Sequence, residues 1–80
     1  MRLPRDVGAQ DLIRALARFG YSVTRQSGSH IRVTTVQGGE HHLTVPNHNP
    51  LRLGTLDGIL SDVSVHLGVS KDQLVRELFG

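Results

Sequence analysis

Residues 21–46 read YSVTRQSGSHIRVTTVQGGEHHLTVP, and apolar residues recur there at every second position within three short runs. This alternation is typical of strands that bury one face and expose the other, because successive side chains point to opposite sides of a sheet. It predicts three antiparallel strands. The side chains expected on the buried face are Tyr21, Val23, Ile31, Val33, Leu43 and Val45.

The alternation also predicts how the second and third strands pair. A two-residue turn at Gly38-Gly39 would set Val33 opposite Thr44, which places an apolar residue across from a polar one. A three-residue loop at Gln37–Gly39 instead sets Val33 opposite Leu43 and makes both faces consistent. The other expected pairs are Ile31 with Val45, Arg32 with Thr44, and Thr34 with His42.

By the same reasoning, a three-residue loop at Gln26–Gly28 closes the first hairpin and sets Thr24 opposite His30. Both loops end in glycine, which suits the left-handed residue that follows a type I turn in such loops. The polar face of the predicted sheet then consists of His30, Arg32, Thr34, His42, Thr44, Ser22 and Thr24.

Amphipathic helices are expected before and after the strands. One covers Asp11–Phe19 and ends at Gly20, and a second begins after a Thr55 cap and ends at Gly68. Apolar residues at helical spacing form the stripe with which the second helix covers the sheet. This stripe consists of Leu56, Ile59, Leu60, Val63 and Leu67.

A short third helix closes the chain, starting at Ser70, which is expected to form a capping box with Gln73. We therefore expect residues 1–80 to form a single α+β domain in the order helix, three strands, helix, helix, with the helices on one face of the sheet. This layout is shared with double-stranded RNA-binding domains, which contact phosphates and 2′-hydroxyls rather than base sequence.

Composition narrows the classes of function. The 80 residues include no cysteine, which excludes disulfides, thiol nucleophiles and cysteine-ligated zinc. No apolar run approaches the roughly 20 residues needed to span a bilayer, so we expect a cytoplasmic protein without membrane contact. The net charge is +2, and eight of the nine basic residues are arginine, whose planar fork matches phosphate oxygens. An anionic partner is indicated, although arginine usage can also reflect thermal adaptation.

His30 is the main candidate for chemistry because it follows a Gly28-Ser29 turn and begins a strand. Histidine has an unperturbed pKa near neutrality and can therefore donate or accept a proton there. Arg32 is expected on the same face, one strand repeat or about 7 Å away, so that the two side chains could reach one phosphate together. The alternative is that the turn only closes a hairpin and that the imidazole is solvated.

Two other chemistries are disfavoured by the residue pattern. His41 and His42 are adjacent and point to opposite faces, and no carboxylate is expected near the histidines at ligand spacing, so no metal site is predicted. Ser29 and His30 do not make a nucleophile pair, because neighbouring side chains in a strand diverge and no third residue orients the ring. No cofactor is expected.

The ordered motifs of the chain resemble those of the HicA family of toxins over nearly the whole sequence. These motifs are Leu12–Phe19 with Gly20-Tyr21, Arg25-Gln26-x-Gly28-Ser29-His30, Thr44-Val45-Pro46, Gly54-Thr55-Leu56 and Ile59-Leu60 with the closing helix. The resemblance implies a double-stranded-RNA-binding-like fold, mRNA interferase activity and neutralisation by a HicB-type antitoxin. It also implies that His30, the histidine of the Gly-Ser-His motif, is catalytic.

A histidine without a metal can cleave RNA, because the 2′-hydroxyl is an internal nucleophile already placed near the phosphorus. The expected function is therefore a metal-independent endoribonuclease acting on mRNA. Candidate RNA-binding residues are Arg32, Ser29, Gly28, Arg25 and Arg52. A noncatalytic RNA-binding domain and a protein-interaction module remain alternatives, and the sequence leaves the oligomeric state open. Many HicA proteins have several lysines in the loop that here contains only Arg52, which predicts a shallow salt dependence of RNA binding.

Overall fold

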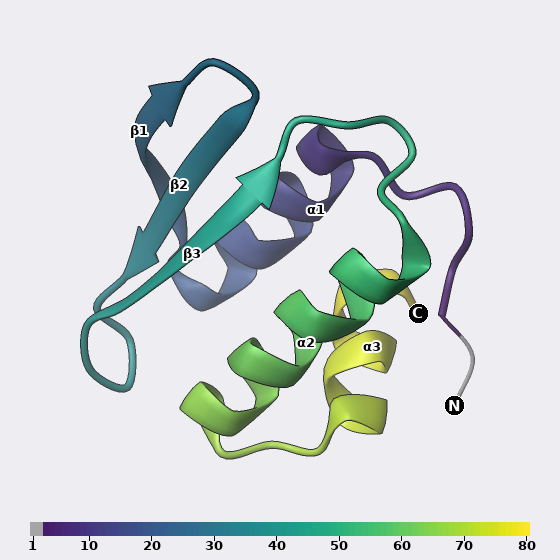
Figure 1. Cartoon of the computed structure of the whole chain (residues 1–80). Coiled ribbons are helices and arrows are strands. Elements are labelled where there is room, and N and C mark those ends of the chain that lie inside the picture. The colour runs from purple at the N-terminus through teal and green to yellow at the C-terminus, as the bar shows by residue number, and fades with distance from the viewer. Residues whose placement is uncertain (1–2) are drawn as a thin grey trace.

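The computed structural model describes residues 3–80 and shows one sheet packed against helices (Figure 1). The elements are α1 (Ala9–Leu16), the short 3-10 helix η1 (Ala17–Phe19), β1 (Ser22–Ser27), β2 (His30–Thr35), β3 (His41–Pro46), α2 (Leu53–Leu67) and α3 (Lys71–Phe79). The sheet is antiparallel with strand order β1-β2-β3. This arrangement confirms the predicted α+β fold of the double-stranded RNA-binding type.

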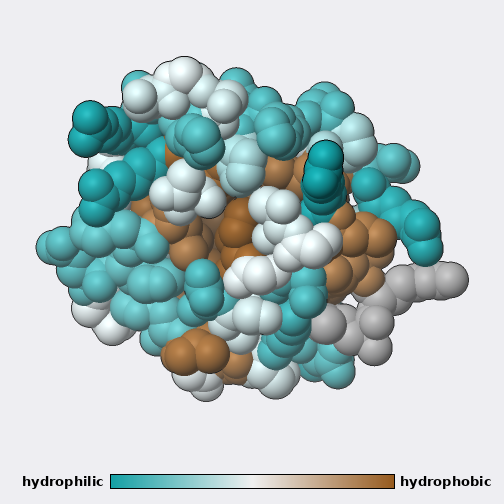
Figure 2. All heavy atoms as spheres, in the orientation of Figure 1, coloured by the Kyte–Doolittle hydropathy of each residue, from teal (hydrophilic) through white to brown (hydrophobic). Residues whose placement is uncertain are grey.

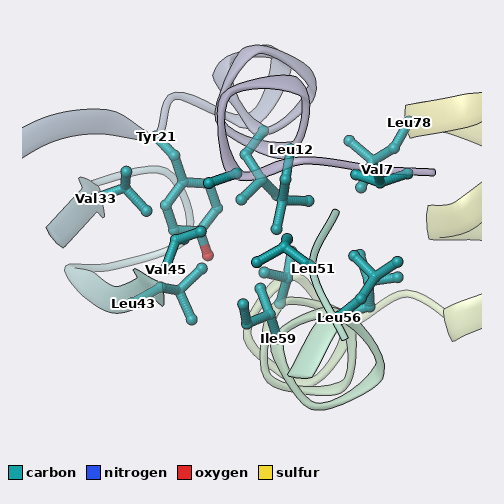
Figure 3. Packing of buried hydrophobic residues seen from close by; sticks show 14 of the residues in the cluster. Val7, Leu12, Tyr21, Val33, Leu43, Val45, Leu51, Leu56, Ile59 and Leu78 are labelled. Atoms are coloured by element: carbon teal, nitrogen blue, oxygen red, sulfur yellow. The ribbon is translucent and has the colours of Figure 1, made fainter. Parts of the chain in front are cut away.

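The helices cover one face of the sheet only. Ile31, Val33 and Val45 are buried against them, whereas Arg32 and Thr44, which alternate with these residues, are exposed. Figure 3 shows Leu12 of α1 and Ile59 of α2 directed towards the apolar residues of the sheet. The core therefore lies between sheet and helices, and the polar face of the sheet remains open.

The helix ends follow the glycines, but the helix starts differ from the prediction. Gly20 and Gly68 both have left-handed backbone conformations, with φ of 81° and 69°. The first helix begins at Ala9 rather than Asp11, and the Asp11 carboxylate accepts a hydrogen bond from the Gly8 N–H across the first turn. The first helix begins before the apolar residues from which it was predicted. A prediction from their periodicity therefore places its start too late.

The second helix also begins earlier than predicted. Its N-cap is Arg52, which has an extended backbone and makes no side-chain cap, and Thr55 lies inside the first turn. Leu53 is 40% exposed, so the earlier start does not extend the buried stripe, which still begins at Leu56. At the third helix Ser70 caps the Gln73 N–H as expected. The Gln73 side chain, however, donates to Glu77 rather than back to the cap, so only half of the predicted capping box is formed.

The pairing of β2 with β3 confirms the predicted register. Val33 lies opposite Leu43 and Thr34 opposite His42, so both faces are consistent in polarity. Gly38 and Gly39 both have positive φ, 71° and 103°, so two loop residues rather than one adopt conformations that favour glycine.

The register predicted for the first hairpin is wrong. His30 lies opposite Ser27, not Thr24, because Gly28 and Ser29 form a two-residue turn in which only Gly28 has positive φ. A β-bulge between Val23 and Arg25 inserts one extra residue into β1. Beyond the bulge, Val23 lies opposite Val33 and Ser22 opposite Thr34, so that paired residues again match in polarity. The parity rule assumes strands without bulges, and it therefore assigns the extra residue to the loop.

Val23 was expected in the core, and this expectation is also wrong. Its side chain is 49% exposed, and every other residue of β1, one of the two edge strands of the sheet, is exposed as well. Tyr21, immediately before β1, is buried and takes its place in the core.

A small polar cluster links the sheet to the end of α2. The Tyr21 hydroxyl lies 2.7 Å from Nδ1 of His41, and the His41 ring stacks on His66 with centroids 4.3 Å apart. His66 Nε2 in turn lies 3.0 Å from the carbonyl oxygen of Gln37. Burial raises the pKa of Tyr21 to about 12, and the negative charge of Asp62 adds to this effect.

The titration of Tyr21 tests this cluster directly, because it is the only tyrosine in the chain. We expect the phenolate absorbance of the folded protein to appear with a midpoint near pH 12, well above the ordinary 10.0. The raised pKa contributes stability that is present below pH 10 and is lost as the pH rises towards 12. A midpoint near 10 in protein that circular dichroism shows to be folded would contradict the buried hydroxyl.

His41 gives a prediction of the opposite sign. Burial lowers the pKa of His41 below its ordinary 6.5, and the positive charge of a protonated His66 lowers it further. The unfolded chain therefore binds the proton first, so the free energy of unfolding should decrease as the pH falls below about 6.5 through the lower folded pKa. Urea denaturation at a series of pH values should show this loss, and His41→Gln should flatten it. An unchanged pH dependence in the variant would exclude His41 as its source.

Candidate nucleic-acid interface

The open face of the sheet gathers the polar side chains that alternate with the core residues. All members of the predicted polar face share it, and the revised first hairpin adds Arg25 and Ser27, which pair with Arg32 and His30. No residue of β1 is buried, and Arg32, His42 and Thr44 are exposed. In the view of Figure 2 hydrophilic residues predominate over the sheet, while apolar residues reach the surface nearer the helices.

His30 lies at one end of this face, as the first residue of β2. It is exposed, and it stands between Ser27 of β1 and Pro46 of β3. Within residues 3–80, no hydrogen bond or ion pair holds its imidazole. The ring is therefore accessible from the open face of the sheet.

The turn before His30 is fastened by its backbone. Gly28 has φ of 58°, a conformation that favours glycine, although a Cβ there would meet no atom within 4 Å. The carbonyl oxygen of Ser29 accepts a hydrogen bond of 2.6 Å from the Asn47 N–H, which joins the turn to the start of the loop after β3. The position of His30 is thus set by the turn and by this loop.

Arg32 and Arg25 lie next along the sheet. Arg32 shares the face with His30 at one strand repeat, about 7 Å, and Arg25 stands directly opposite Arg32. Like charges in this position disfavour the pairing of two strands. Neither guanidinium has a carboxylate partner within residues 3–80, so both are available to an anion. Arg52, by contrast, lies at the N-cap of α2 beyond the loop and is not part of the sheet face.

A chain of hydrogen bonds crosses the other end of the face. Thr24 Oγ1 lies 2.9 Å from Thr34 Oγ1, which lies 2.7 Å from Nδ1 of His42. Nε2 of His42 lies 2.7 Å from a carboxylate oxygen of Glu40. No carboxylate was expected near the histidines at metal-ligand spacing, but the Glu40 carboxylate lies within hydrogen-bond distance of His42. The signal was present in the sequence, because Glu40 and His42 are two residues apart and so share a face.

The two histidines of this face are well separated. His42 is opposite Thr34, four residues along β2 from His30, which corresponds to about 13 Å. His30 and His42 therefore lie towards opposite ends of this face. His41 points to the other face, as predicted, and among residues 3–80 no group of three His, Cys, Asp or Glu side chains is placed to hold a metal ion.

Comparison with protein families identifies the family of this chain. The family model described as the HicA toxin of bacterial toxin-antitoxin systems matches residues 9–65. This chain belongs to the HicA toxin family. Searches of curated proteins and of solved structures found no match.

The HicA match spans α1, the whole sheet and most of α2, and it therefore includes His30 and both sheet arginines. It stops before α3. Membership of this family implies a toxin that works with an antitoxin partner. Across the part of this HicA chain that the structure describes, no helix has the length and hydrophobicity needed to traverse a bilayer.

Proposed function

We propose that this HicA protein is a metal-independent endoribonuclease that cleaves mRNA and in which His30 is the catalytic residue. The observation that supports this most directly is the position of His30, exposed at the start of β2 on a polar face that also presents Arg32. The family match covers that same stretch. A substrate with closely spaced negative charges and an internal nucleophile suits one accessible imidazole beside guanidinium groups.

The proposed reaction is transfer of a phosphodiester within the RNA. The 2′-oxygen forms a bond to phosphorus while the bond to the 5′-oxygen breaks, which yields a 2′,3′-cyclic phosphate and a 5′-hydroxyl. The proton of the 2′-hydroxyl is removed and the leaving 5′-oxygen gains one. The His30 imidazole performs one of these two proton transfers, and Arg32 stabilises the charge on the phosphate oxygens.

The surrounding residues position the RNA in this scheme. Arg25 and Arg32 contact backbone phosphates along the sheet, and the Gly28-Ser29 turn approaches the sugar-phosphate backbone beside His30. Arg52 contacts the RNA strand at the point where the RNA leaves the sheet, near the loop after β3. We further propose that residues 1–80 act as one cytoplasmic domain, without a cofactor, and that a HicB-type antitoxin inhibits the enzyme.

Replacing the imidazole tests the proposal. His30→Ala should lose at least 10²- to 10⁴-fold in cleavage rate, which is the usual contribution of a positioned acid or base. The assay is incubation of purified protein with mixed-sequence RNA in EDTA, followed by identification of the 3′ ends. His48→Ala removes an exposed imidazole from the loop and should retain activity. Intact RNA with the wild-type protein, or full activity in His30→Ala, would refute the proposed catalysis.

The salt dependence of RNA binding tests the number of phosphate contacts. Three arginines contacting three phosphates predict that the logarithm of the RNA affinity falls with the logarithm of salt concentration with a slope of about −2. Arg25→Ala should reduce the slope by about 0.7. Fluorescence anisotropy of His30→Ala protein with labelled RNA measures it without cleavage. A much steeper slope would show that the binding surface extends beyond these residues.

A further inference from the structure

A shallow depression on the open face combines the two sheet arginines with four side chains to which the proposed cleavage assigns no role. Its lining residues are Thr24, Arg25, Arg32, Thr34, Glu40 and His42. Two guanidinium groups, two hydroxyls and an imidazole thus meet with one carboxylate. Hydrogen-bond donors and positive charge of this kind favour an anion with several oxygens, of which phosphate is the common biological example.

The Glu40 carboxylate already occupies one anion position there. It lies 2.7 Å from His42 Nε2 and, because an ionised carboxylate only accepts hydrogen bonds, the imidazole donates. Both side chains are accessible, with 68% of Glu40 and 37% of His42 exposed. Exposed pairs of this kind contribute little to stability, so another anion can displace the carboxylate.

The imidazole is held in place from its other side. Nδ1 of His42 is hydrogen-bonded to the Thr34 hydroxyl, which is itself hydrogen-bonded to the hydroxyl of Thr24 on the neighbouring strand. This chain of three side chains orients the ring so that Nε2 stays directed at the position of Glu40. A phosphate oxygen that replaced the carboxylate would find the donor already oriented.

We propose that this depression is a second phosphate-binding subsite for the RNA backbone, and that Glu40 competes with the phosphate for His42. The proposal rests on the proposed function for the identity of its ligand. His42, the imidazole donor of the subsite, lies about 13 Å from His30 along β2, and Arg32, which lines the near side of the subsite, stands between the two histidines. The subsite therefore holds a phosphate other than the one that is cleaved. It fixes how the strand lies on the sheet and takes no part in proton transfer at the cleaved bond.

A double-mutant cycle tests the competition, with anisotropy of a labelled 2′-O-methyl RNA, which lacks the attacking hydroxyl. Glu40→Gln should tighten binding about two- to fivefold, the size expected for release of an exposed ion pair. His42→Ala should weaken binding, and in that background Glu40→Gln should have no further effect. Glu77→Gln makes the same charge change on α3 and is the control; it should leave affinity unchanged.

Two results would overturn the subsite. One is an equal increase in RNA affinity with Glu40→Gln and with Glu77→Gln. The other is an increase in affinity with Glu40→Gln that persists in the His42→Ala background. Either result would indicate an effect of charge rather than competition for His42. With cleavable RNA, Glu40→Gln should lower KM and leave kcat unchanged.

The subsite and the proposed function can fail separately. Cleavage that depends on His30 without coupling between Glu40 and His42 leaves the nuclease and removes the subsite. Coupled binding of the 2′-O-methyl RNA without cleavage of ordinary RNA supports the subsite and removes the nuclease.

Discussion

Burial of a single face of the sheet is the constraint on which the rest of this molecule depends. Ile31, Val33 and Val45 are almost completely inaccessible, and the residues that alternate with them along each strand must therefore point away from the helices. Among residues 3–80 no element packs on the opposite face of the three-stranded sheet, which is therefore open. The requirement for a core thus produces a continuous open surface, and His30 and Arg32 lie on it for the same reason that Ile31 does not.

The difference between the two hairpins shows where reasoning from the sequence succeeds and where it ends. The β2–β3 register could be predicted because both strands alternate without interruption, so only one loop length keeps Val33 against Leu43. The β1–β2 register could not, because the bulge near Thr24 adds a residue that alternation cannot distinguish from a loop residue. β1 is an exposed edge strand, and because none of its side chains is buried, packing gives little energetic preference for one register.

The candidate site shows the same division. His30 and Arg32 could be placed on one face from their spacing alone, since they lie on the same strand. Arg25 was named as a candidate RNA-binding residue but was not placed on the polar face, because its pairing with Arg32 depends on the two-residue turn and the bulge. The contact of Glu40 with His42 was missed although both lie on one face, because spacing gives direction but not whether two exposed side chains meet.

The bulge in β1 has consequences for both assembly and function. An exposed edge strand offers unpaired backbone groups to other chains, and a bulge together with a charged residue such as Arg25 discourages that pairing. The same bulge sets Arg25 across from Arg32, where two positive charges repel and no carboxylate within residues 3–80 neutralises them. This repulsion is tolerated because the stability of the fold comes from the opposite face, where the sheet packs against Leu12 and Leu60. A phosphate bound between the two arginines would remove the repulsion, so the feature that weakens the free sheet would strengthen its complex with RNA.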